Sequence, residues 1–471
     1  MKRTRGVTFH RVLPGLLVLT SSLCNLCVLC VAVVSGQQET KITTETQRTQ
    51  RSHRESRIEN TEALAKFFQT LASAQTKQRI DPVRIMHFGD SHVAADVLTR
   101  EIRERFQVDF GDGGAGFIVP RNPMATKRRG VSSGFTEGWV VEGIGGKYSA
   151  DALYGPAGID IATSDPGERA WLEASANHFE VYFARQPNGG KVEITIDGVD
   201  ALEEPLLLNS RVSKLDSIAI DVPDDAPHRL EVRTLSPGRV RLLGIVAEHL
   251  SGGVSYDVFG INGAKASRIL SWNQAALIAA IKARDPNLII LAYGTNELTD
   301  GTWTATSYES LLAEILQLFH KAAPNASIVV FGPPDRGDLP LTAQLKELIS
   351  AEHRAALANN AAFWSAFDAM GAAGSILKWV RIGLAQPDRV HLTTAGYTKL
   401  ADMFYEDLQR ARRGSSPTVK EGSSRPTLRS LDISPPWQSG YCPDVGNHSS
   451  ISHSHSTHHH GFPSLTPLPQ R

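Results

Sequence analysis

Cysteine is scarce in this chain of 471 residues, and the positions of its four cysteines exclude two classes of protein. Three lie in an apolar segment near the N-terminus and the fourth lies close to the C-terminus: Cys24, Cys27, Cys30 and Cys442. The long stretch between Cys30 and Cys442 has none, which excludes a disulfide-stapled scaffold. The first three have the spacing of iron–sulfur ligands. However, Val34 stands at the fourth position in a hydrophobic setting, which argues against a cluster.

An excess of charge of one sign is also absent, because 49 Lys and Arg residues balance 49 Asp and Glu residues. A chain without net positive charge gives no reason to expect a nucleic-acid partner. Internal repeats are absent as well. With 41% hydrophobic residues, a chain of this length can bury at least one large core and is expected to form more than one domain.

Residues 12–34 form a mostly apolar stretch that follows four basic residues: Lys2, Arg3, Arg5 and Arg11. The small residues Ser35 and Gly36 then offer a cleavage site. Residues 1–36 are therefore predicted to be a signal peptide or an uncleaved membrane anchor. Either places the rest of the chain outside the cytoplasm, secreted or in a periplasm, or held at the inner membrane. A lipoprotein is disfavoured, because each N-terminal cysteine follows a leucine where lipidation requires a small residue.

Polar composition marks both ends of the predicted folded region. Residues 37–60 are rich in Thr, Gln, Arg and Glu and are predicted to be a linker. Residues 413–471 are rich in Ser, Pro and His and are predicted to be a disordered tail. An unstructured polar tail is favoured over a metal site, although five of its histidines could bind a metal ion: His453, His455, His458, His459 and His460.

Strand-like and helix-like segments alternate in residues 61–133 and again in residues 249–412. The strand-like segments include residues 84–88, 287–292 and 327–331. This alternation favours an α/β fold, in which helices flank a parallel sheet. In such a fold the functional site is expected at the carboxyl ends of the strands.

Residues 134–248 have a different pattern, with apolar residues at every second position. Two of these runs are joined by Pro187-Asn188-Gly189-Gly190, which is typical of a β-hairpin. Several short strands with turns between them indicate a β-sandwich inserted into the α/β fold. Burial is the commoner fate of aromatic residues, but three in this segment could stack on sugar rings: Trp139, Trp171 and Tyr182.

Residues 111–116 match the pattern G-x-G-x-x-G. A dinucleotide-binding segment of this type must follow a strand and open a helix, whereas this one follows a predicted helix. We therefore predict a loop beside the functional site and no nucleotide cofactor.

A serine, an aspartate and a histidine occur in a pattern that suits acyl-transfer chemistry. Gly89-Asp90-Ser91-His92 ends a strand-like run and opens a helix, and Asp388 and His391 lie three residues apart much later in the chain. A serine hydroxyl attacks well only when a base takes its proton, and a carboxylate that fixes the tautomer improves the base. Ser91, Asp388 and His391 are therefore candidate catalytic residues.

Two further segments provide donors for the negative charge that develops on a carbonyl oxygen during acyl transfer. The segment 260–264 contains Gly263, which lets the backbone approach a substrate, and the segment 293–297 contains Asn296, which offers a side-chain NH₂. Both segments follow predicted strands, as Ser91 does. All three residues are therefore expected at one edge of the sheet.

These four blocks resemble those of the SGNH (GDSL-type) hydrolase superfamily, named after its Ser, Gly, Asn and His. The resemblance implies a flavodoxin-like α/β fold with Ser91 as nucleophile and Asp388 and His391 as the rest of the triad. It also implies an oxyanion hole of the Ser91 N–H, Gly263 and Asn296, and no metal or organic cofactor. The first block usually reads Gly-Asp-Ser-Leu. We interpret His92, in place of the Leu, as a tolerated neighbour that could touch the substrate.

The β-rich insertion between the first two blocks resembles that of bacterial peptidoglycan O-acetylesterases, in which a carbohydrate-binding-module-like β-sandwich interrupts the catalytic domain. The resemblance implies hydrolysis of acetyl esters on a cell-wall polysaccharide, with peptidoglycan as the first choice of substrate. Three alternatives stay open: an acetylesterase on xylan or pectin, a sugar O-acetyltransferase, and a non-catalytic carbohydrate-binding protein. The last is disfavoured because all five chemical positions are filled.

Overall fold

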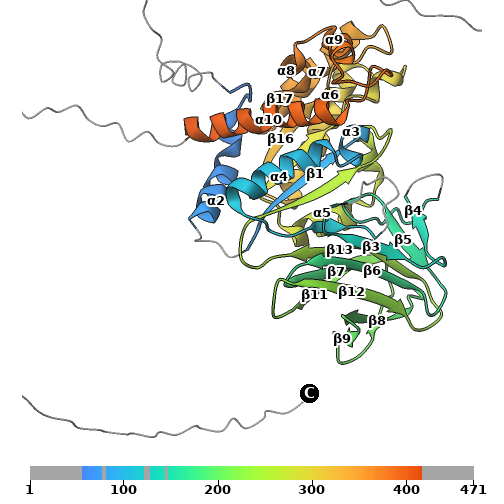
Figure 1. Cartoon of the computed structure of the whole chain (residues 1–471). Coiled ribbons are helices and arrows are strands. Elements are labelled where there is room, and N and C mark those ends of the chain that lie inside the picture. Colours follow the sequence, from blue (N-terminus) through green and yellow to red (C-terminus); the bar gives the residue numbers. More distant parts are fainter. Residues whose placement is uncertain (1–55, 77–80, 121–127, 144–146, 416–471) are drawn as a thin grey trace, which may run out of the picture. The chain divides into compact units, whose positions relative to one another are not determined.

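The computed structural model describes residues 56–76, 81–120, 128–143 and 147–415 (Figure 1). The predicted signal peptide or anchor, nearly all of the linker and the histidines of the predicted tail lie outside the described residues. Among the described residues, none of the helices combines the length and the apolar character needed to cross a membrane.

Five parallel strands form one sheet in the order β14-β1-β15-β16-β17. Their bounds are β1 Val83–Gly89, β14 Val254–Gly260, β15 Leu288–Ala292, β16 Ser327–Gly332 and β17 Ala362–Ser365. β15 and β16 are buried at every position, as expected for strands that are covered on both faces. The chain places β14 on one side of β1 and β15 on the other. In open α/β sheets, ligands bind beyond the carboxyl ends of the strands where the strand order reverses in this way.

Two groups of helices cover the two faces of this sheet. On one face α2 (Ala65–Gln75), α4 (Leu98–Phe110) and α10 (Thr394–Ser415) pack together, and on the other α5 (Gln274–Arg284), α6 (Ala305–Ala322) and α7 (Thr342–Ala358) do so. The short helices are η1 Thr61–Leu64, α3 Ser91–Ala94, η2 Ala266–Ser271, η3 Glu297–Thr299, α8 Ala366–Met370 and α9 Ser375–Arg381. The predicted α/β fold with a parallel sheet and flanking helices is confirmed.

Two further sheets of six strands each lie between β1 and β14 in sequence, and all of their strand pairs are antiparallel. One has the order β10-β8-β12-β6-β3 with β9 on β8, and the other has the order β11-β7-β13-β5-β4 with β2 on β13. The bounds are β2 Gly116–Ile118, β3 Ser132–Phe135, β4 Val140–Glu142, β5 Asp160–Thr163, β6 Arg169–Ser175, β7 His178–Arg185, β8 Lys191–Ile196, β9 Val199–Asp200, β10 Leu206–Leu207, β11 Lys214–Asp221, β12 Pro227–Thr234 and β13 Val240–Glu248. β2 and β3 begin before residue 134, where the insertion was predicted to start.

The turn at residues 187–190 does not form the predicted hairpin. It joins β7 to β8, but these strands belong to different sheets, so the chain crosses from one sheet to the other here. Gly189 lies against the carbonyl oxygen of Leu208, a position that has no room for a Cβ atom. β7 pairs with β11 and β13, whereas β8 pairs with β9, β10 and β12. A local turn pattern cannot report which sheet each strand joins.

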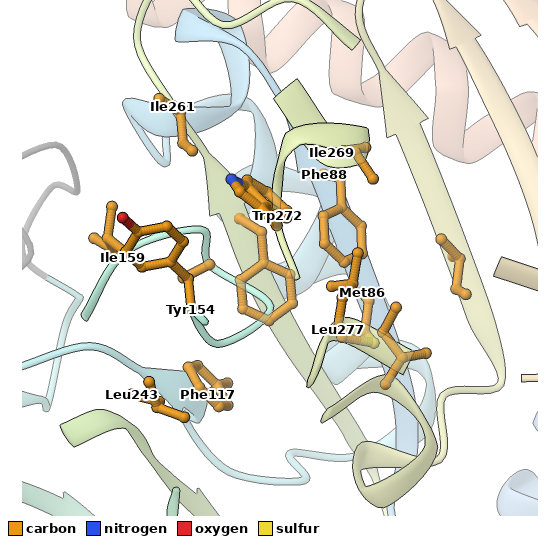
Figure 2. Close-up of a cluster of buried hydrophobic side chains, with 14 of the residues drawn as sticks. Met86, Phe88, Phe117, Tyr154, Ile159, Leu243, Ile261, Ile269, Trp272 and Leu277 are labelled. Atoms are coloured by element: carbon orange, nitrogen blue, oxygen red, sulfur yellow. The ribbon is translucent and has the colours of Figure 1, made fainter. Parts of the chain in front are cut away.

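Aromatic side chains fill the core beside the antiparallel sheets. Phe117 packs against Tyr182 and Phe259, at ring-centroid distances of 5.3 and 5.5 Å, and Figure 2 shows it near Leu243 and Tyr154. Tyr182 and Trp139 are buried, so neither can stack on a sugar ring as the sequence allowed. Trp171 is partly exposed, but the Arg229 guanidinium lies 4.7 Å from the centre of its ring.

The glycine-rich loop at residues 111–116 does not line the carboxyl end of the sheet. The backbone N–H of Gly113 donates to the carbonyl oxygen of Val254 at 3.0 Å, and the N–H of Val254 donates to that of Gly111 at 2.9 Å. Val254 is the first residue of β14, at the end opposite to Gly260. A Cβ atom on Gly113 would lie 2.7 Å from the Val254 carbonyl carbon, and one on Gly114 would lie 2.6 Å from the Ala247 oxygen. The glycines are therefore needed for close backbone packing against β13 and β14. The prediction that this loop lies beside the site is wrong.

A buried ion-pair network joins the end of β13 to the parallel sheet. The Glu248 carboxylate forms ion pairs with Arg84 of β1 at 2.8 Å and with Arg284 of α5 at 2.5 Å. Arg284 also forms an ion pair with Asp257 of β14 at 2.8 Å. Burial alone would raise the pKa of Glu248, but the two arginines lower it to about 2. The carboxylate therefore stays charged at neutral pH and fixes β13 against β1 and α5.

Candidate active site

Ser91 stands at a sharp turn between β1 and α3. Asp90 caps the short helix, and its carboxylate accepts a hydrogen bond from the backbone N–H of His92 at 2.9 Å. Gly89 fits between Val93 and the carbonyl oxygen of Ala292, where no Cβ atom has room. Strand, tight turn and helix start together place the Ser91 side chain beyond the carboxyl end of the strand.

Ser91, His391 and Asp388 form a continuous hydrogen-bonded relay. The Ser91 Oγ lies 2.9 Å from the Nε2 of His391, and the Nδ1 of His391 lies 2.8 Å from the Oδ2 of Asp388. In the tautomer with a proton on Nδ1, the ring donates to Asp388 and Nε2 is free to accept from the serine hydroxyl. The three residues that the sequence singled out are therefore in mutual contact, in the geometry required of a nucleophile, a base and an orienting carboxylate.

A compact turn before α10 holds the aspartate and the histidine. The Oδ1 of Asp388 accepts from the backbone N–H groups of Val390 and His391, both at 3.0 Å. Burial raises the pKa of Asp388, but the Val390 N–H and the His391 side chain outweigh it, and the pKa ends below its ordinary value. Arg389 between them has a φ of 60°. Asp388 is thus held as a carboxylate whose other oxygen faces the histidine ring.

Gly263 and Asn296 come from neighbouring loops beyond β14 and β15. Gly263 is exposed, has a φ of 73°, and has no atom within 4 Å of the position of a Cβ. The Nδ2 of Asn296 donates to the carbonyl oxygen of Ala264 at 2.9 Å. An amide nitrogen has two donors, so this bond fixes the orientation of Asn296 and leaves the second N–H for another acceptor.

His92 does not face solvent, contrary to the interpretation of it as a substrate neighbour. It is buried, and its Nδ1 lies 2.8 Å from the hydroxyl oxygen of Tyr397 on α10. Burial lowers the pKa of His92, which keeps the ring neutral. The centre of its ring lies 5.3 Å from that of the His391 ring, so His92 packs against the candidate catalytic histidine.

A loop after β16 contacts both the Asn296 segment and the Asp388–His391 turn. This loop is not among the sites predicted from the sequence. Arg336 is buried, donates to the carbonyl oxygen of Thr295 at 2.5 Å and pairs with Asp338. The backbone N–H of Gly337 donates to the carbonyl oxygen of Arg389 at 2.9 Å. The sequence feature that could have indicated this loop is the polar segment directly after the strand predicted at residues 327–331.

The described residues contain no group of three or more His, Cys, Asp or Glu side chains that could hold a metal ion.

One family model matches part of this chain. Residues 216–399 match the model of the GDSL-like lipase/acylhydrolase family, a range that includes Gly263, Asn296, Asp388 and His391. The strands β2–β13 separate the Ser91 block from the other three in sequence. This match agrees with the resemblance to the SGNH hydrolase superfamily seen in the four sequence blocks.

Among solved structures, a peptidoglycan O-acetylesterase matches over 74% of this chain and 97% of its own, with 24% identity and a TM-score of 0.63. A family two carbohydrate esterase from Cellvibrio japonicus matches over 60% of this chain and 99% of its own, with 13% identity and a TM-score of 0.27. A lipase/acylhydrolase from Enterococcus faecalis matches over 33% and 76%, with 16% identity and a TM-score of 0.27. No curated protein sequence matches this chain. The family match and the first of these structures support the fold of an SGNH-type hydrolase.

Proposed function

We propose that this protein is a serine esterase that removes O-acetyl groups from a cell-wall polysaccharide, with peptidoglycan as the first choice of substrate. The observation that carries the proposal is the relay from Ser91 through His391 to Asp388, with oxygen–nitrogen distances of 2.9 and 2.8 Å. The fold shared with a peptidoglycan O-acetylesterase supports the choice of substrate.

In the proposed reaction, His391 takes the proton from the Ser91 hydroxyl while Oγ forms a bond to the acetyl carbonyl carbon. The tetrahedral intermediate collapses, the bond to the sugar oxygen breaks, and that oxygen receives the proton from His391. Water then attacks the acetyl-serine as His391 takes one of its protons. Acetate leaves, and Ser91 regains its hydrogen.

The oxyanion of the intermediate is proposed to accept from the backbone N–H groups of Ser91 and Gly263 and from the side chain of Asn296. Gly263 suits this role because it is exposed and no atom lies within 4 Å of the position of a Cβ. The bond from Asn296 to Ala264 fixes the amide before the substrate arrives. Fixed donors lower the barrier most, because they need no reorganisation as the charge develops.

An open site fits an ester carried on a polymer. The side chains of His391 and Asp388 are 41% and 48% exposed, so the acetyl group can approach while the rest of the chain of sugars stays in solvent. Residues 134–248 are proposed to act as an inserted β-rich module that extends the contact surface for the glycan. Residues 1–36 are proposed to direct the protein out of the cytoplasm.

The Asn296→Ala variant is expected to lower kcat on 4-nitrophenyl acetate about 10²- to 10³-fold, the usual cost of losing one oxyanion donor. KM should change little, because the donor stabilises the transition state more than the ground state. Steady-state kinetics measure both constants, and a thermal melt checks folding. Normal turnover in a destabilised protein would make Asn296 a structural residue.

The substrate proposal is tested by acetate release from O-acetylated peptidoglycan and from acetylated xylan at matched acetyl concentrations. Specificity is a ratio of kcat/KM values, and we expect this ratio to favour peptidoglycan about tenfold or more. The Ser91→Ala protein serves as the blank for each polymer. A ratio in favour of xylan would overturn the wall assignment and leave the esterase chemistry in place. With an added chito-oligosaccharide acceptor, acetylated sugar formed at the expense of free acetate would indicate a transferase.

A further inference from the structure

Glu297 is a buried carboxylate next to Asn296 that has no role in the proposed reaction steps. It opens the short helix η3, and 4% of its surface is exposed. A charged side chain is seldom buried without partners, because the loss of its water shell is strongly unfavourable. Its partners therefore indicate what it does.

Each oxygen of the Glu297 carboxylate accepts a hydrogen bond from a different loop. Oε1 accepts from the backbone N–H of Ala266 at 2.7 Å, and Oε2 accepts from the backbone N–H of Gly294 at 2.9 Å. Ala266 lies three residues after Gly263, and Gly294 lies two residues before Asn296. One side chain thus ties together the two loops that carry the proposed oxyanion donors.

Other contacts favour a fixed arrangement around this carboxylate. The Nδ2 of Asn296 donates a hydrogen bond to the carbonyl oxygen of Ala264, which gives a second link between the two loops. A Cβ atom on Gly294 would lie 2.9 Å from the Oε1 of Glu352, so this backbone is packed closely against α7. Because oxyanion stabilisation depends on donors lying within a few tenths of an ångström, a fixed spacing between the loops has a direct catalytic value.

We propose that Glu297 is a positioning residue that holds the Gly263 loop and the Asn296 loop at the separation needed to bind the oxyanion. This inference rests on the proposed esterase function. Glu297 touches no reacting atom; it acts through the backbone N–H groups of Ala266 and Gly294.

The charge state of Glu297 supplies a pH signature. Burial raises its pKa to about 7, opposed by the Ala266 and Gly294 N–H groups, and the charge of Asp90 raises it further. Glu352 also lies close; burial raises its pKa well above the ordinary value, and its Oε1 accepts from the hydroxyl of Tyr308 at 2.9 Å. As pH rises through about 7, Glu297 ionises, and its two oxygens then accept the N–H bonds more strongly.

The test uses Glu297→Gln, which keeps the shape but replaces one acceptor oxygen by an NH₂ group that cannot accept. We expect kcat on 4-nitrophenyl acetate to fall about 10- to 100-fold with KM within twofold of wild type, since misplaced donors affect mainly the transition state. The ratio of wild-type to variant kcat should increase as pH rises through about 7. Dividing the two rates removes any pH dependence that both proteins share.

A second variant covers the case in which Glu297→Gln does not fold. We call Glu297 and its two partners, the backbone N–H groups of Ala266 and Gly294, the clamp. Ala266→Pro removes one of these N–H groups, at the first position of η2, where proline is normally tolerated. We expect a similar loss of kcat. Ala305→Pro is the matched control, because Ala305 is the first residue of α6 and lies outside the site. This control should keep kcat within about threefold of wild type.

Amide hydrogen exchange at Ala266 and Gly294 tests the clamp without reference to activity. Exchange at both should be at least about tenfold faster in Glu297→Gln than in wild type. Unchanged exchange would overturn the inference, and so would faster exchange with an unchanged kcat or with a change in KM alone. If Ser91→Ala hydrolyses the ester as fast as wild type, the proposed function fails, while the exchange result still decides whether the clamp exists.

Discussion

Ser91→Ala is expected to lower kcat for ester hydrolysis on the order of 10⁶-fold, the cost of removing the nucleophile from a relay of this kind. Without Oγ no acetyl-enzyme can form, and only binding and the oxyanion donors remain to accelerate attack by water. Release of 4-nitrophenol from the acetate ester, followed over hours at high enzyme concentration, measures the residual rate.

The stability of this variant should change by less than about 1 kcal/mol, because the lost hydroxyl group is only partly buried. Ser350→Ala is a matched control, since Ser350 is exposed on α7 and its hydroxyl bonds only within the helix. Wild-type turnover in folded Ser91→Ala would remove Ser91 from the mechanism. A lower melting temperature combined with lost activity would require the activity to be measured again on the folded fraction.

His391→Ala is expected to lower kcat about 10⁴- to 10⁶-fold, because the serine hydroxyl then loses the base at 2.9 Å that takes its proton. The same kinetic assay measures the effect, with KM recorded separately. His353→Ala is the matched control: its ring is partly exposed and pairs with Glu59 on the surface.

The double variant Ser91→Ala/His391→Ala separates a shared mechanism from two independent effects. Residues that act as one unit are not additive, so the double variant should be no slower than Ser91→Ala alone. A further loss close to the product of the single effects would mean that the two residues serve different steps.

Parts of this protein that depend on short segments could be predicted from the sequence. Buried runs such as residues 288–292 are apolar throughout, and this pattern predicts strands of a parallel sheet. Asp388 and His391 lie on one turn, where their contact needs only three residues of spacing. Ser91 and Asn296 follow predicted strands, and parallel strands bring their carboxyl ends to one edge.

Other parts depended on contacts between segments far apart in the chain. The turn at residues 187–190 has the composition of a hairpin, yet β7 pairs with β11 and β13, and β8 pairs with β10 and β12. The glycine-rich loop packs at the start of β14 because Gly113 and Gly114 fit against the backbones of β14 and β13. No local pattern reports which distant strand a loop will meet.

The sequence by itself determined the type of fold and the chemistry available, because both follow from the period of apolar residues and from a few polar residues at strand ends. Only the tertiary structure decided which of the remaining polar and aromatic residues are buried and what they contact. Trp139 and Tyr182 fill the core, His92 bonds to Tyr397, and Glu297 joins two loops. These outcomes depend on packing between elements that are distant in sequence, and the free energy of a buried polar group is set by partners that its own segment does not contain.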